Sequence, residues 1–345
     1  MQDYSDDLLD SLRTRQDPDA DAVIAAYFPR DKNLLQAHLN HLTDNSANLP
    51  NSTYAPLDEL FGIVRSHAEN FDKEELIKGQ KFFSNYASDI MLLLGFMSLP
   101  YCYAAANGAE VLVRSKRILN DPASRLMDTA SFVFEVMSPE AFLPQGKGLV
   151  SILKVRLQHA ATRWYINNEG GWDSKVFGDP INQEDMAGTN LSFSLITVRG
   201  LRKLGKFITP ESAYHYISYW NKIGLLMGLD KEFIPKNNKE TFALERNIRV
   251  RQFKNSEAGK VLTKSLLEYY QDATRDSPLE GYSKTFMNYL LGDKVSRMIG
   301  LEIENYDRLV FKPYQLFISF RGFFFEAQDS YAKAFARFQE NKPED

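Results

Sequence analysis

The sequence predicts an all-α protein. Apolar residues recur every three or four positions along most of the chain, whereas the strict alternation typical of strands is hard to find. Two helix starts also carry capping chemistry. Asn182 lies three residues before Asp185, and Thr209, Pro210 and Glu211 supply an N-cap, a proline at the first helical position and an acid in the first turn.

In the first part of the chain, the earliest expected helix spans residues 21–28, a short apolar run after an Asp-Pro-Asp start. A second, over 34–42, ends where the polar stretch NSANLPNSTYAP indicates a loop. Residues 74–97 fit one long helix with a strongly apolar second half. Helices over 103–120 and 123–137 are separated by Asn-Asp-Pro, because proline does not continue a helix.

The second part of the chain continues the helical pattern. A loop with one proline and two glycines precedes the next helix, and residues 167–180 form a Gly/Asn/Asp-rich connector. The aromatic-rich segment 311–325 fits either a strand or a buried helix. The later expected helices span residues 149–166, 183–204, 209–229, 257–272 and 282–300. We therefore expect a single helical domain over residues 1–345, with 240–345 as a C-terminal helical extension packed on it.

Composition excludes several classes of protein. The 345 residues include 41 Lys and Arg against 45 Asp and Glu, without a basic block, which argues against nucleic acid as a partner. A single cysteine, Cys102, excludes a disulfide framework, and we interpret it as a small packed side chain. The acidic N-terminus does not resemble a secretory signal. The apolar stretch 90–106 is broken by Pro100 and fits a buried helix pair better than a membrane span. We expect a cytoplasmic protein.

Missing motifs exclude further chemistry. The chain has no GxGxxG, no GxxxxGK[ST], no HExxH and no GxSxG. No histidine has a glutamate three residues upstream, so the ligand pattern of di-iron bundles is absent. His38 and His41 share a helix face without acidic neighbours, and His67 lies in a polar run.

One histidine lies in an unusual setting. In LVSILKVRLQHAATRWYI, His159 shares an apolar helix face with Arg156 and Arg163, each about one turn away. Neutral imidazole is the commonest metal ligand and the usual proximal ligand of haem, and arginines can pair with haem propionates. The alternative is a satisfied core histidine with two surface arginines paired to local acids. His215 is the second-choice iron ligand.

A second polar cluster lies on the helix before it. Arg125, Asp128 and Thr129 fall at i, i+3 and i+4 on an otherwise apolar helix. Such a trio could donate hydrogen bonds to iron-bound oxygen and move a proton. The alternative is an intrahelical Arg–Asp pair, with Thr129 bonded back to the backbone.

Several pieces together resemble one family. They are DPDADAVI (17–24), YAAANGAEVL (103–112), RLMDT (125–129), KVRLQHAATR (154–163), GDPINQEDMAGT (178–189) and GLRKLG followed by TPESA (200–213). Over about 17–235, the chain resembles the rubber-oxygenase (latex clearing protein)/MpaB catalytic-domain family. The GDPINQ block with HxxxR upstream is the most specific part.

The resemblance implies a helical fold with a globin-like core that binds haem b. It places the proximal iron ligand at His159 and distal residues at Arg125 and Thr129. The rubber-cleaving members carry a lysine where this chain has Asp128, and their distal glutamate corresponds most nearly to Glu110. Because rubber cleavage needs an exported enzyme, rubber itself is not the expected substrate.

The GDPINQED block is interpreted as structural. Its Asn182, Gln183 and Asp185 would cap a helix and brace the helix that carries His159, and the alternative is that they orient the Nδ1–H of His159. The expected function is a haem-dependent oxygenase. It would use dioxygen, with an electron donor as a further partner, on an apolar substrate of unsaturated or isoprenoid-like type. Glu110 or Asp128 would accept a proton. The alternatives are a gas-sensing or gas-carrying haem protein, a haem peroxidase-like enzyme, and a haem-free helical interaction protein.

Overall fold

The computed structural model describes residues 4–115, 117–301, 318–321, 330–340 and 342. Every regular element in these residues is a helix, and none of them forms a strand, which confirms the predicted all-α class. Of the aromatic-rich segment 311–325, only 318–321 is described, and it is helical. The rest of that segment lies outside the described residues.

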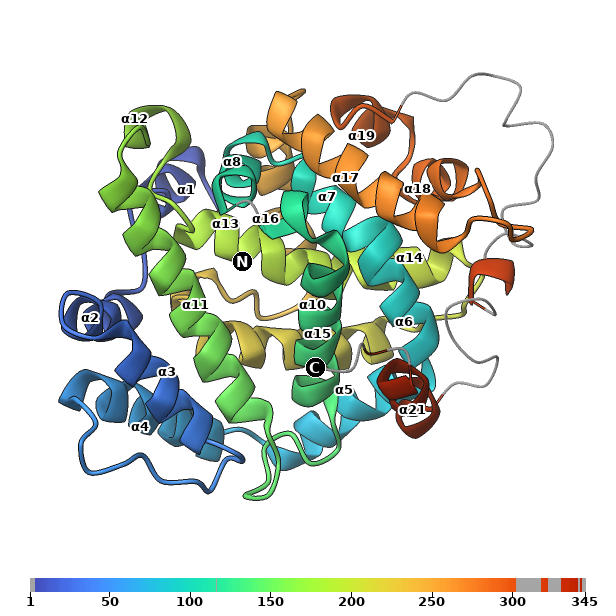
Figure 1. The fold of residues 1–345 in the computed structure, drawn as a ribbon. Helices are drawn as coiled ribbons and strands as arrows, with labels where there is room; N and C mark the ends of the chain where they lie inside the picture. Colours follow the sequence, from blue (N-terminus) through green and yellow to red (C-terminus); the bar gives the residue numbers. More distant parts are fainter. Residues whose placement is uncertain (1–3, 116, 302–317, 322–329, 341, 343–345) are drawn as a thin grey trace.

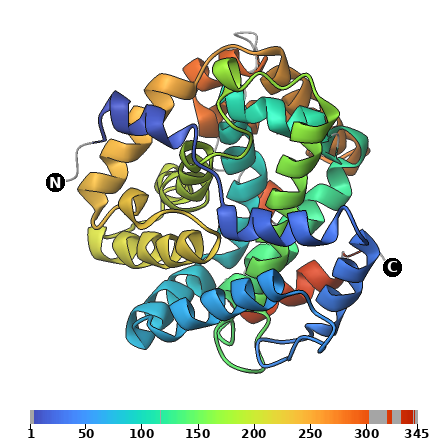
Figure 2. The same ribbon diagram turned by 90° about the vertical axis from the view of Figure 1, so that its left-hand side faces the viewer.

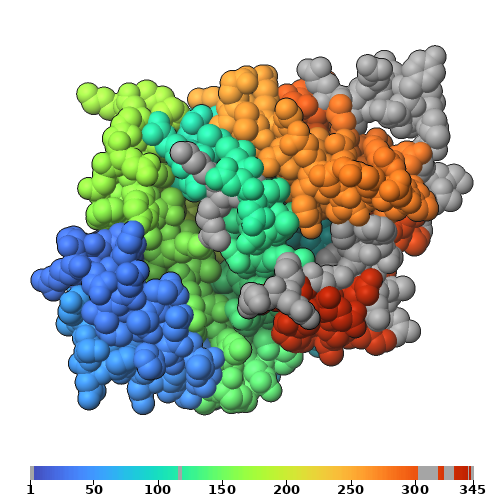
Figure 3. Space-filling view, in the orientation of Figure 1, coloured from blue at the N-terminus to red at the C-terminus, as the bar shows by residue number. Residues whose placement is uncertain are grey.

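The N-terminal helices lie at one side of the molecule, opposite the C-terminal helices (Figures 1 and 3). They are α1 (Asp6–Leu12), α2 (Pro18–Tyr27), α3 (Lys32–His41) and α4 (Ala55–Glu69). Helix α2 begins three residues earlier than the sequence predicts, because Asp17 caps it and Pro18 occupies its first position. Helix α4 was not predicted at all.

The long helix expected over 74–97 is broken in the structure. Helix α5 (Lys73–Asn85) ends at a bend of 79°, after which the chain continues as α6 (Ala87–Leu93), a π-helical segment (Leu94–Ser98) and α7 (Leu99–Tyr103). Among the described residues no single helix is both long and apolar enough to cross a membrane, and only the bent pair reaches that composition when its parts are combined.

The next elements surround the middle of the molecule. They are α8 (Ala106–Ser115), α9 (Arg117–Asn120), α10 (Pro122–Met137), α11 (Gly148–Glu169) and the short α12 (Ser174–Phe177). Asp121 caps α10 by accepting a hydrogen bond from the amide of Ser124, with Pro122 at the first position.

The centre of the fold is a second broken helix. It consists of α13 (Gln183–Leu191), a π-helical segment (Ser192–Ile196) and α14 (Thr197–Lys203), and Figure 2 looks along its axis, with other helices around it. The hydroxyl of Ser98 donates a hydrogen bond to the Ser192 carbonyl at 2.8 Å, so the two π-helical segments are in contact. π-Helical turns interrupt the regular hydrogen-bond ladder and occur often near functional sites.

The C-terminal part packs around this centre. Its elements are α15 (Pro210–Leu226), a 3₁₀ turn (Lys231–Phe233), α16 (Asn238–Gln252), α17 (Glu257–Ala273), α18 (Ser283–Leu291), α19 (Asp293–Met298) and α21 (Tyr331–Glu340). Thr209 caps α15 as predicted, accepting a hydrogen bond from the amide of Ser212. Helix α16 was not predicted.

A pair of glycines tests the packing of α5 on α15. A Cβ atom at Gly79 would lie 2.5 Å from Cβ of Tyr219, whereas one at Gly62 in α4 would meet nothing within 4 Å. We expect Gly79→Ala to lower the free energy of unfolding by about 1–3 kcal/mol through overpacking. Gly62→Ala should raise it by up to about 1 kcal/mol, because alanine favours the helix. Urea unfolding of both variants checks this, and equal effects would contradict the close α5–α15 contact.

Candidate active site

A cavity of about 300 Å³ lies inside the helical domain, bounded mainly by α7, α8, α10, α11, α13, α15 and α16. This volume falls at the lower end of the range for pockets that hold small molecules or cofactors. Most of the lining is apolar, and includes Leu112, Phe132, Val155, Met186, Phe193 and Ile223. The polar part of the lining includes His159 on α11 and charged side chains on α10, α13 and α16.

His159 lines this cavity from the middle of α11. Val155 and Thr162 line it too, since positions three and four residues away share a helix face. Burial, together with the nearby charges of Arg163 and Arg125, lowers the pKa of His159 to about 3. Its Nδ1 is buried and has no hydrogen-bond partner among the described residues. At neutral pH the imidazole is therefore uncharged, which is the form that binds metal ions.

The polar cluster on α10 also lies at the cavity wall, where Arg125, Asp128 and Thr129 are lining residues. Nη1 of Arg125 donates a hydrogen bond to Oγ1 of Thr129 at 3.0 Å, and that hydroxyl donates to the Arg125 carbonyl at 2.9 Å. Thr129 thereby holds the guanidinium of Arg125 in place. Its own bond to the Arg125 carbonyl is the side-chain-to-backbone bond that the alternative interpretation expects. Arg125 and His159 line the same cavity, and the charge of Arg125 contributes to the lowered pKa of His159.

The two arginines beside His159 point elsewhere. Arg156 forms a buried bidentate pair with Asp17, with N–O distances of 2.6 and 2.7 Å. Arg163 donates from Nε to Asp21 at 2.7 Å. Neither arginine is a lining residue of the cavity. Both pair instead with carboxylates of the α2 region, which are distant in the sequence, and the expectation that they hold haem propionates stays a prediction.

The position of Glu110 also departs from expectation. On α8 the residues that line the cavity include Gly108, Val111, Leu112 and Ser115, which share one face, and Glu110 does not lie on it. Of the two carboxylates expected to accept a proton, only Asp128 lines the cavity.

The GDPINQED block starts α13 as the capping chemistry predicts. The side-chain oxygen of Asn182 accepts a hydrogen bond from the Asp185 amide at 3.0 Å. Gln183 donates to the carbonyls of Gln16 and Gly228, at 3.0 and 2.9 Å. These contacts join α13 to the chain beside α2 and after α15. Neither residue reaches Nδ1 of His159, so the orienting role is not supported.

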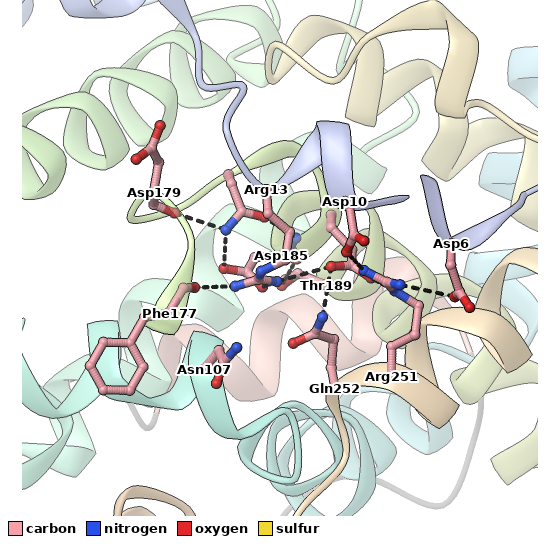
Figure 4. A network of polar contacts seen from close by, with 12 residues as sticks. Asp6, Asp10, Arg13, Asn107, Phe177, Asp179, Asp185, Thr189, Arg251 and Gln252 are labelled. Carbon is pink, nitrogen blue, oxygen red and sulfur yellow. Dashed lines mark hydrogen bonds and ion pairs between the residues drawn. The ribbon is translucent and has the colours of Figure 1, made fainter. Parts of the chain in front are cut away.

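A charged network forms the cavity wall beyond this block (Figure 4). Glu184 is fully buried and accepts hydrogen bonds from Arg13 at 3.0 Å, Arg251 at 3.0 Å and Gln252 at 2.7 Å. Arg13 also donates to Asp185 at 3.1 Å. Burial raises the pKa of Asp185 to about 6 in spite of that arginine. Sequence reasoning missed this wall, because Arg13 is 171 residues from Glu184.

The remaining candidates have other environments. Both ring nitrogens of His38 are in hydrogen bonds, with Tyr27 at 2.8 Å and Ser52 at 3.1 Å. The described residues contain no cluster of histidine, cysteine and acidic side chains that could hold a metal ion. His215 does not line the cavity, so it cannot replace His159 there. Cys102 lines the cavity 3.0 Å from the hydroxyl of Ser192, and burial raises its pKa to about 11.

Fold and site together define an all-α protein that encloses a largely apolar cavity, with a neutral histidine and an arginine in its lining. A sequence model described as "ER-bound oxygenase mpaB/B'/Rubber oxygenase, catalytic domain" matches residues 85–320, and the chain belongs to this family. The match extends well beyond residue 240, where the sequence resemblance was not recognised.

The chain is also similar to two individual proteins. The rubber oxygenase of Streptomyces sp. (strain K30) is 27% identical over 311 residues, which cover 88% of this chain and 75% of that protein. A solved structure of latex clearing protein in the closed state superposes with a TM-score of 0.71 at 24% identity, covering 94% of this chain and 90% of the other. The second comparison supports the fold.

Proposed function

We propose that the protein is a haem b-dependent oxygenase that uses dioxygen on an apolar, isoprenoid-like substrate, with His159 as the iron ligand. The observation that carries the proposal is the neutral imidazole of His159 at the wall of an apolar cavity, close to Arg125. The names of the family and of the rubber oxygenase relative support the oxygenase activity and the type of substrate.

The residues at the site fit a haem. An imidazole with a pKa of about 3 does not have to lose a proton before it binds iron. The apolar lining suits the porphyrin face. Nδ1 of His159 has no hydrogen-bond partner among the described residues, so it is not engaged by another group of the protein there. When bound there, haem would supply the redox chemistry that activates dioxygen.

The protein's own groups would orient and protect the reaction. Thr129 fixes the guanidinium of Arg125, which places positive charge at the cavity wall without a rearrangement. Asp128 is the carboxylate that would accept a proton from the substrate, because Glu110 does not line the cavity. The apolar lining would bind the hydrocarbon part of the substrate and exclude water.

An absorption spectrum tests the proposal. The purified chain, alone and after addition of haem, should show a strong Soret band, which His159→Ala should abolish or shift. His215→Ala is the matched control and should retain the wild-type spectrum, because His215 lies outside the cavity. A wild-type chain without a Soret band after haem addition would refute the proposal, and so would a His159→Ala spectrum identical to wild type.

A further inference from the structure

One face of α13 presents two polar side chains to the apolar cavity. Asp185 and Thr189 are four residues apart and both line the cavity. Thr189 is exposed, and Asp185 retains 14% of its side-chain surface although the groups around it bury its carboxyl. Both side chains therefore keep accessible surface, and both are lining residues of the cavity.

Both side chains have spare capacity to accept hydrogen bonds. Oδ1 of Asp185 accepts from Arg13 at 3.1 Å and Oδ2 accepts from Nδ2 of Asn182 at 2.9 Å. An ionised carboxylate has about four acceptor sites, so each oxygen can accept one more bond. The Thr189 hydroxyl donates to the Asp185 carbonyl at 2.8 Å, which leaves its oxygen as an acceptor. The pair therefore offers acceptors and needs a donor.

The surrounding charges favour a neutral donor. Arg13 touches the carboxylate directly, and Arg13 and Arg251 together hold Glu184. Glu184 is thus already paired, and Arg125 adds a further positive charge to the lining. The carboxylates of Glu184 and Asp185 thus already have cationic partners, and an uncharged hydroxyl group can donate to the remaining acceptor sites without competing with these ion pairs.

We infer that Asp185 and Thr189 bind a hydroxyl group of the cavity's ligand, so that the substrate is an apolar alcohol and not a pure hydrocarbon. That the bound alcohol is a substrate rests on the proposed oxygenase function. That the cavity binds an alcohol at Asp185 and Thr189 does not. A site built to accept a hydroxyl proton discriminates against an analogue that lacks it, because the largely buried carboxylate of Asp185 then loses that partner.

The groups that face Asp185 also predict a pH dependence. These are Arg13 after α1, Glu184 and Asn182 on its own segment, and the neutral thiol of Cys102 on α7. Burial raises the pKa of Asp185 to about 6, so the carboxylate is largely protonated at pH 5 and ionised at pH 7.5. Because the ionised form is the stronger acceptor, alcohol binding should strengthen over this range.

Calorimetric titration of the 345-residue chain with 1-decanol and with 1-methoxydecane tests the inference. Both probes are saturated and therefore bind without an allylic reaction, and only the alcohol can donate a hydrogen bond. We expect the wild type to prefer the alcohol by about tenfold or more. Asp185→Asn should reduce that preference and remove its rise between pH 5 and 7.5, and Thr189→Val should reduce it at all pH values.

Glu110→Gln is the matched control, because it removes a carboxylate of α8 that does not line the cavity, and it should keep the wild-type preference. Equal binding of the two probes, or a preference unchanged in both Asp185→Asn and Thr189→Val, would overturn the inference. If Asp185→Asn does not fold, Thr189→Val alone decides. The spectrum of His159→Ala is independent of this result, so failure of the hydroxyl site and failure of the haem proposal can be told apart.

Discussion

Replacing Asp17 with asparagine is expected to lower the free energy of unfolding by about 3 kcal/mol, because it leaves the charge of Arg156 buried without its partner. The side chains of Arg156 and Asp17 are only 5% and 9% exposed. Asparagine can still cap α2, so the variant isolates the loss of charge from the loss of the cap.

Asp19→Asn provides the control within the same helix. Asp19 lies 3.6 Å from Arg156 but is 53% exposed, so its loss should cost less than about 1 kcal/mol. Urea unfolding of the two variants measures the difference. Equal losses of unfolding free energy in the two variants would show that solvent also screens the Asp17–Arg156 pair. The pair would then not stabilise the contact between α2 and α11.

The environment of this pair explains why its effect should be large. Arg156 also donates to the Leu226 carbonyl at 3.2 Å, at the end of α15. Two residues on, Gly228 has φ +90°, and a Cβ atom there would lie 2.5 Å from Oδ2 of Asp17. The pair therefore joins α2, α11 and the turn after α15, and it lies one turn from His159. Its effect on the site is through the position of α11.

The sequence predicts the position of Arg156 but not its partner. Helical spacing correctly places Arg156 on the side of α11 near His159, and from there a haem propionate is a reasonable partner. Asp17 is 139 residues away in the sequence, and no periodicity within one helix can indicate a partner at that distance. The same limit applies to Arg13 and Glu184, so the charged wall of the cavity could be found only from the structure.

The break in the helix expected over 74–97 and the missed helix α16 also have physical reasons. Residues 74–97 have an apolar pattern that continues across the bend at Tyr86, because the halves on both sides are buried. Helix α16 was missed because its buried face includes Glu240, Glu245 and Gln252, polar residues that suggest solvent exposure. Glu245 is buried with Arg199 at 2.7 Å and Arg249 at 2.8 Å, partners that compensate its charge. Hydrophobic periodicity cannot recognise a helix that packs through ion pairs.

The metal-free protein is expected to lose about 2 kcal/mol of stability between pH 7 and pH 5 through His159 alone. The pKa of this histidine falls from 6.5 in the unfolded chain to about 3 in the fold. At pH 5 the unfolded state therefore binds a proton that the folded state excludes. Its contribution is complete above pH 6.5 and is lost progressively as the pH falls toward 3.

Comparison with His159→Gln isolates this contribution, because the other titrating groups, Asp185 among them, are common to both proteins. Urea unfolding at pH 7 and pH 5 should show the stability of the wild type falling by about 2 kcal/mol more than that of the variant. The exposed His41→Gln variant controls for the loss of a histidine. Parallel losses in wild type and His159→Gln would mean that the imidazole takes up a proton inside the fold. A proton would then compete with iron for the ring nitrogen in mild acid, and haem binding should weaken as the pH falls through the ordinary histidine value of 6.5.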